Sequence, residues 1–93
     1  MPGNKQKQRL ALRAINKRKA FERDGFECRH CGKHDWRGLS VHHVVHLGRG
    51  GSDAVDNLVT LCGDCHAQCH YWQTPYLWVR FIDGDFQFSR EKF

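Results

Sequence analysis

The sequence lacks a long apolar run. No stretch approaches the roughly 20 residues that a membrane-spanning helix needs, and the first residues carry no apolar segment of the kind found in secretory signal peptides. We therefore expect a cytoplasmic protein with no membrane partner. Internal repeats and low-complexity linkers are also missing, so the 93 residues are predicted to form one domain, residues 1–93.

Acidic side chains are scarce near the N-terminus. Residues 1–23 contain eight Lys and Arg and one Glu, a net charge of +7, whereas the remainder has seven basic and nine acidic residues, a net charge of −2. Such a basic block suits a polyanion such as nucleic acid, although a solvated helix face would have the same composition. The candidate DNA-contacting residues are Lys5, Lys7, Arg9, Arg13, Lys17 and Arg18, with Arg49 from a later loop.

Five cysteines are many for a chain this short. Small domains bury little apolar surface, and metals or disulfides often supplement their cores. In a reducing compartment, paired Cys-x-x-Cys units indicate zinc rather than disulfides. Cys28 with Cys31, and Cys62 with Cys65, form two such pairs, so we predict a structural zinc held by four thiolates. Cys69 is predicted to be a buried small apolar residue.

Residues 5–23 predict a basic helix. They are rich in helix formers and contain no Pro or Gly. Their apolar residues recur near one face, which we expect to dock on the small core. That face contains Leu10, Ala14, Ile15 and Phe21.

The middle of the chain predicts two strands and a helix. The segment 39–45 is apolar and β-branched, and 58–61 is a second short strand. Three glycines between residues 48 and 52 require a loop between them. A helix is expected over 64–72, before Pro75.

The C-terminal residues 76–90 predict a β-hairpin. Two segments rich in β-forming residues meet at Asp83-Gly84, a dipeptide suited to a type I′ turn. We expect this hairpin to complete the core. The alternative is a dimer or partner surface formed by Trp78, Phe86 and Phe88.

Five of the seven histidines fall between residues 41 and 70. Neighbouring residues of a strand point to opposite faces, so His42 and His43 can do different jobs, one binding a metal and the other facing a substrate. His66 and His70 are four apart on the predicted helix, which is metal-ligand spacing. Asn57 is placed where it can hold a histidine in orientation. The remaining histidines receive no partner and are expected at the surface or beside the site, namely His30, His34 and His46.

The order His-His, Gly-Gly, Asn-Leu and Cys-x-x-Cys-His, in VHHVVHLGRGGSDAVDNLVTLCGDCH, resembles the HNH endonuclease family. The preceding AFERDGFECRHCG is similar to the lead-in of its zinc-stapled, stand-alone members, many of them from phages. The resemblance covers residues 20–72 and leaves out the hairpin. It implies a small α+β protein with a ββα-metal, treble-clef-like core over residues 26–72.

The resemblance also implies roles for site residues. His43 would be the general base that takes a proton from the attacking water, and Asn57 would orient it. His42 and His66 would bind one catalytic divalent metal, with His70 as a third ligand, as in the colicin-like branch. Many members carry Asp at the position of His42. An all-imidazole site favours Zn, Ni, Co or Mn over Mg as the catalytic ion.

The expected function is metal-dependent hydrolysis of DNA phosphodiester bonds, by nicking or by double-strand cleavage. A neutral histidine near pH 7 can activate water, and the metal relieves charge that develops on the phosphate. DNA is the expected partner, a phage packaging or recombination protein is a conceivable one, and a phage-encoded chain would work in the host cytoplasm. The alternative is a non-catalytic, zinc-stabilised module that only binds nucleic acid, which would leave His43 and Asn57 without a purpose.

Overall fold

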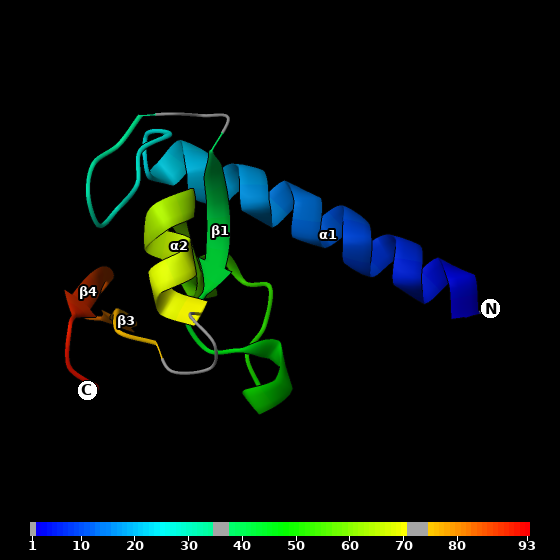
Figure 1. Cartoon of the computed structure of the whole chain (residues 1–93). Coiled ribbons are helices and arrows are strands. Elements are labelled where there is room, and N and C mark those ends of the chain that lie inside the picture. The colour runs from blue at the N-terminus through cyan, green and yellow to red at the C-terminus, as the bar shows by residue number, and fades with distance from the viewer. Residues whose placement is uncertain (1, 35–37, 71–74) are drawn as a thin grey trace.

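The computed structural model describes residues 2–34, 38–70 and 75–93, with the backbone alone described for residues 2–7 and 9. These residues form a small α+β fold of two helices and two antiparallel sheets, as predicted (Figure 1). The elements in chain order are α1 (Pro2–Arg23), β1 (Leu39–His43), β2 (Leu58–Cys62), α2 (Gly63–His70), β3 (Trp78–Ile82) and β4 (Asp85–Ser89). Two short 3-10 turns lie between β1 and β2, namely η1 (Leu47–Arg49) and η2 (Val55–Asn57).

Strands β1 and β2 form an antiparallel pair that carries α2. The register places Leu39 opposite Cys62 and His43 opposite Leu58. All five residues of β2 are buried, and α2 begins directly after it and packs on both strands (Figure 1). β1 ends two residues before the predicted limit, because the side chain of Asn57 takes the backbone groups of Val45 that a partner strand would otherwise bond.

Helix α1 is anchored at its C-terminal end. Ala20 is fully buried, whereas Leu10 and Ile15 are 60% and 53% exposed, and the N-terminal turns project from the rest of the chain (Figure 1). The prediction that this apolar face docks on the core is therefore wrong for Leu10 and Ile15. A helix of 22 residues outruns the small sheet beneath it. It also begins at Pro2, before the predicted start, and Pro suits a first helical position because its missing N–H is not needed there.

None of the described helices has the length and apolar character that crossing a membrane requires. α1 has the length, but its sequence is dominated by polar and basic residues.

The hairpin formed by β3 and β4 completes the core. Its turn places Asp83 at φ 53° and Gly84 at φ 79°, which is the left-handed pair of a type I′ turn, as predicted. Phe86 is 8% exposed and belongs to the core, while Trp78 and Phe88 are half-buried. These three residues therefore do not form the exposed apolar patch that was the alternative.

The core is unusually rich in cysteine. Among the described residues, the buried apolar cluster has eight members, namely Cys28, Val59, Leu61, Cys62, Cys65, Cys69, Leu77 and Phe86. Half of them are cysteines, so the packing of this small interior depends on what the thiols do. Cys69 is 6% exposed, as predicted, and burial raises the pKa of its thiol to about 11.

A buried carboxylate joins the end of α1 to β2. The side chain of Asp24 is fully buried. It accepts hydrogen bonds of 2.8 and 2.7 Å from the guanidinium of Arg23, and one of 3.1 Å from the backbone N–H of Thr60. Arg23 also donates to the backbone oxygens of Val55 and Leu58. Burial alone would raise the pKa of Asp24, but the hydrogen bonds from Arg23 and Thr60 lower it below its ordinary value.

We expect Asp24→Asn to lower the free energy of unfolding by about 2–4 kcal/mol near neutral pH, because it leaves the half-buried Arg23 guanidinium without its anionic partner. Urea unfolding followed by circular dichroism measures this. Because the folded pKa is lowered, the stabilisation is present above the unfolded pKa of about 3.9 and is lost as the pH falls through the folded pKa. The difference between variant and wild type should therefore shrink in acid.

The matched control is Asp56→Asn, which changes an exposed carboxylate in η2. Equal losses for the two variants, or a difference that stays constant down to about pH 2, would contradict the role given to Asp24.

Candidate functional site

The four paired cysteines form one cluster. Their sulfur atoms all lie within 4.8 Å of one another, and the cysteines are free thiols rather than disulfides. The sulfurs of Cys31 and Cys62 are 3.6 Å apart, close to the edge of about 3.8 Å expected for a tetrahedron of thiolates around zinc. In each pair, the second cysteine's backbone N–H points to the first cysteine's sulfur at 3.5 Å. The cluster is compatible with zinc binding.

The electrostatics of this cluster call for a cation. Burial raises the pKa of the Cys65 thiol, and the neighbouring sulfurs raise it further. Burial also tends to raise the pKa of the Cys28 thiol, but hydrogen bonds from backbone N–H groups outweigh burial and lower this pKa to about 7. Thiolates this close repel one another, so a positive ion is needed to keep all four ionised. His30, for which the sequence offered no partner, places Nδ1 3.3 Å from the sulfur of Cys65.

A second cluster is made of imidazoles. His42 on β1 meets His66 and His70 on α2. One ring nitrogen from each of the three residues lies within 4.8 Å of the other two. Nδ1 of His42 is 2.9 Å from Nε2 of His70. His42 is buried, His66 half-buried and His70 exposed, so the cluster runs from the interior to the surface. The structure thus brings together the three histidines predicted as metal ligands.

The imidazoles of this cluster are held neutral. Burial, followed by the proximity of His70 and His66, lowers the pKa of His42 to about 3. Burial also lowers the pKa of His66 and His70. Neutral rings offer lone pairs to a cation. Ser40, which the sequence did not single out, lies 2.6 Å from Nδ1 of His66 and leaves Nε2 as the nitrogen available for a metal.

His43 is oriented by a carboxylate. Its Nε2 lies 2.8 Å from Oδ1 of Asp53, an oxygen that also accepts a 3.2 Å hydrogen bond from Nε of Arg13. The hydrogen bonds from His43 and Arg13 lower the pKa of Asp53, so it is ionised near neutral pH. An ionised Asp53 accepts the Nε2–H of His43 and leaves Nδ1 to take up a proton. His43 directly follows His42 in β1, so the ring bonded to Asp53 and the imidazole cluster are carried by the same strand.

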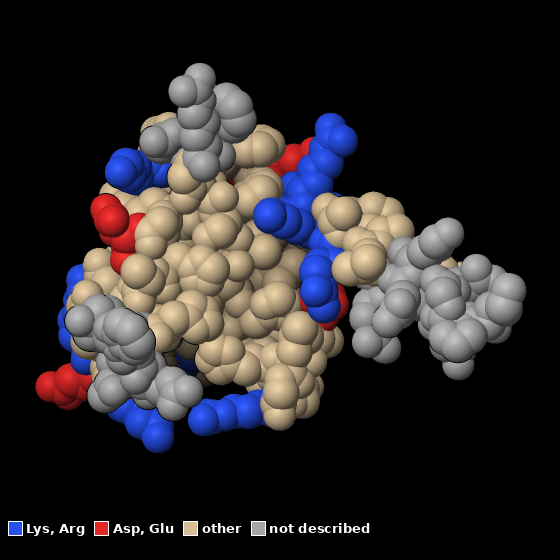
Figure 2. Space-filling model, turned by 45° about the vertical axis from the view of Figure 1, so that its right-hand side comes forward, with Lys and Arg blue, Asp and Glu red and all other residues tan. Residues whose placement is uncertain are grey.

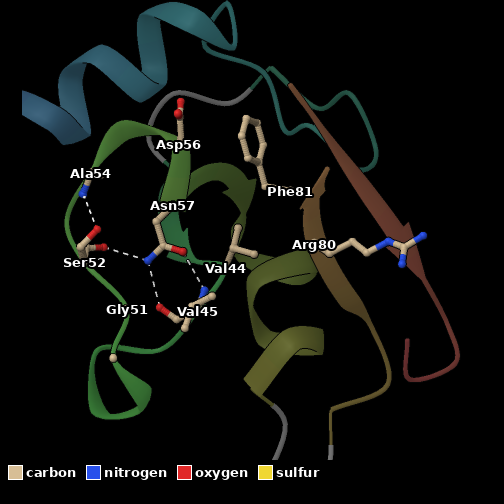
Figure 3. A pocket seen from close by; sticks show the side chains of 10 residues that line it. Val44, Val45, Gly51, Ser52, Ala54, Asp56, Asn57, Arg80 and Phe81 are labelled. Carbon is tan, nitrogen blue, oxygen red and sulfur yellow. Dashed lines mark hydrogen bonds between the residues drawn. The ribbon is translucent and has the colours of Figure 1, made fainter. Parts of the chain in front are cut away.

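Asn57 holds the loop rather than the ring of His43. Its amide oxygen accepts from the N–H of Val45 at 2.8 Å, and its Nδ2 donates to the backbone oxygens of Val45 and Ser52 at 2.9 and 2.8 Å (Figure 3). Gly51 lies in the same loop, and a Cβ there would stand 1.8 Å from the oxygen of Val45. The contact with the His43 ring is made by Asp53, which the same loop carries.

The basic side chains divide between structural and exposed positions. On α1, Arg13 is half-buried and bonded to Asp53, whereas Lys17 and Arg18 are exposed, Arg18 in a surface pair with Glu22 at 3.1 Å. Figure 2 shows Lys and Arg side chains gathered beside the protruding helix. Three of the predicted DNA contacts lie outside the residues whose side chains the structure describes, namely Lys5, Lys7 and Arg9.

A cavity of about 490 Å³ opens beside the imidazole cluster. His42, His46 and His70 line it, together with Trp78 and Val79 of the hairpin. Arg49 and Lys92 also line it, so the cavity combines imidazoles with two cations. The predicted DNA contact of Arg49 thus lies close to the candidate metal ligands.

Two comparisons with known proteins found similar sequences. Residues 28–71 match the HNH endonuclease family. A segment of 33 residues is 54% identical to the type IV methyl-directed restriction enzyme EcoKMcrA of Escherichia coli (strain K12), covering 36% of this chain and 12% of that enzyme. The chain therefore corresponds to a small part of that relative. No solved structure matches.

The matched residues 28–71 contain both clusters, the pair of His43 and Asp53, and the loop that Asn57 holds. Residues 28–71 of this chain are an HNH endonuclease domain.

Proposed function

We propose that this chain is a metal-dependent endonuclease that hydrolyses DNA phosphodiester bonds. One observation carries the proposal: His43, hydrogen-bonded to the ionised Asp53, directly follows His42 in β1, and His42 belongs to a group of three neutral imidazoles suited to a divalent cation. A base and a cation are the two parts that phosphodiester hydrolysis needs. Membership of residues 28–71 in the HNH endonuclease family supports the same chemistry.

In this proposal His43 is the general base. Asp53 accepts the Nε2–H, which fixes the tautomer and leaves Nδ1 to take a proton from the attacking water. The imidazolium that results stays next to the Asp53 carboxylate, which stabilises its charge. Asn57 contributes by holding the loop on which Asp53 sits.

His42, His66 and His70 would hold one divalent ion. When bound, the ion supplies Lewis-acid stabilisation of the charge that develops on the phosphoryl and leaving oxygens. Three imidazoles favour Zn, Ni, Co or Mn over Mg, which prefers oxygen ligands. Ser40 would keep His66 in the ring orientation that ligation requires.

The fold supports these assignments. Strands β1 and β2 followed by α2 give the order of a ββα-metal core. The cysteine cluster would hold a structural zinc, which ties the knuckle of Cys28 and Cys31 to the start of α2. α1, with its surplus of basic residues, and the cations of the cavity would follow the DNA backbone.

The first test is plasmid cleavage by wild type and His43→Ala with Mg, Mn, Co, Ni and Zn. We expect the substitution to lower the rate about 10²–10⁴-fold through loss of the base, while DNA binding and circular dichroism stay unchanged. His34→Ala, which removes a ring that is 66% exposed and paired with Glu27, is the matched control. Wild type that binds DNA but cleaves with none of these metals would favour a non-catalytic binding module instead.

A second test addresses Asp53. We expect Asp53→Asn to lower the cleavage rate about 10- to 100-fold, because His43 loses the acceptor that fixes its tautomer. Nitrogen-15 NMR of the His43 ring reports that tautomer directly, and Asp53→Glu should restore part of the rate. The control is Asp56→Asn. A slower Asp53→Asn enzyme whose His43 ring still shows the wild-type tautomer would argue against this role.

A third test addresses the structural zinc, in a His42→Ala background that disables the imidazole site. We expect the parent to contain one zinc per chain, and an added Cys65→Ser to remove it and unfold the domain, since such sites contribute on the order of 10 kcal/mol. Cys69→Ala, which removes the buried thiol outside the cluster, should keep the zinc. Metal analysis and circular dichroism measure both. A folded, zinc-containing Cys65→Ser variant would refute the site.

A further inference from the structure

His46 lies at the open side of the imidazole cluster. Its ring centroid is 5.8 Å from that of His42 and 5.4 Å from that of His70. The three candidate ligands are separated by 4.7 to 5.3 Å in the same measure. The distances from the His46 ring to the rings of His42 and His70 are therefore only slightly longer than those among the three candidate ligands.

The backbone of His46 is fixed from both sides. Its carbonyl oxygen accepts hydrogen bonds from the N–H groups of Arg49 and Gly51, at 2.9 and 3.0 Å. The preceding residue, Val45, has its N–H and its carbonyl bonded by the Asn57 side chain. These hydrogen bonds hold the backbone at His46 in place, although β1 has already ended.

The ring of His46 has room to move. It is exposed and lines the cavity that His42 and His70 also line. Because the side chain is exposed, packing does not fix its rotamer, and reaching the cluster requires a change of rotamer only. Arg49 and Lys92, on the same cavity, offer charge to a phosphate but no lone pair to a metal.

We propose that His46 is a fourth imidazole ligand of the metal centre, which thereby binds a transition-metal ion such as Zn²⁺, Co²⁺ or Ni²⁺ and discriminates against Mg²⁺. The inference rests on the proposed metal site at His42, His66 and His70. Nitrogen ligands favour the later first-row metals, and an ion held by four imidazoles can still accept a phosphate oxygen as a fifth ligand, since zinc in catalytic sites expands to five-coordination. The loop held by Asn57 and Gly51 then serves to present this ligand as well as Asp53.

The experiment uses the full chain with zinc in the cysteine site and Co²⁺ titrated into the imidazole site. The d–d absorption of Co²⁺ gives the dissociation constant, and X-ray absorption at the cobalt edge counts imidazoles. We expect His46→Ala to weaken Co²⁺ binding by at least about tenfold, and to lower the imidazole count from four to three. His34→Ala should behave as wild type, and absence of cobalt–thiolate absorption confirms that zinc still fills the cysteine site.

His42→Ala separates failure of this inference from failure of the proposed site. If His42→Ala loses Co²⁺ while His46→Ala keeps wild-type affinity and imidazole count, His46 is no ligand and the three-histidine site stands. If His42→Ala also keeps Co²⁺, the metal site itself is refuted. If His46→Ala leaves Co²⁺ unchanged but weakens metal-free DNA binding, His46 contacts phosphate and the inference is overturned.

Discussion

The buried carboxylate of Asp24 determines how the separate parts of this small chain meet. It bonds Arg23 at the end of α1 and the backbone of Thr60 in β2, and the guanidinium of Arg29 lies 3.6 Å away. Arg29 in turn pairs with Asp85 at the start of β4. An unpaired buried charge costs several kcal/mol, so the helix, the sheet, the first cysteine pair and the hairpin are constrained to meet around this one anion.

Anchoring α1 at this point also fixes its relation to the candidate site. The helix is held at its C-terminal end, and about two and three turns earlier Asn16 and Arg13 reach the loop. Arg13 donates a hydrogen bond to the side chain of Asp53, and Asn16 donates one to the backbone carbonyl oxygen of Asp53. In the proposed function the basic helix would therefore do more than offer charge to DNA, because Arg13 and Asn16 also hold Asp53, the carboxylate bonded to His43. Binding of DNA along α1 and activation of the base would share one rigid connection.

Sequence spacing predicted the features whose geometry is local. Each of these features depends only on residues that are close in the sequence. They are the two Cys-x-x-Cys pairs, the one-turn spacing of His66 and His70, and the turn at Asp83-Gly84. Asp53 and Ser40 could not be found this way, because their contacts with His43 and His66 depend on how a loop and two elements fold together. The apolar pattern of α1 identified a face but not its burial, because periodicity does not show whether the sheet beneath extends far enough.

The two clusters depend on each other through α2. Cys65 and Cys69 face the interior, and His66 and His70 are the residues that directly follow them. α2 has eight residues, whereas isolated helices shorter than about 12–15 residues are marginal in water. Its rotation is therefore set by what holds its buried face, which is the thiol cluster and the core around it. An ion at the cysteines would hold α2 in the orientation that brings His66 and His70 to His42, so in the proposed function the cysteine site would be a precondition of the imidazole site.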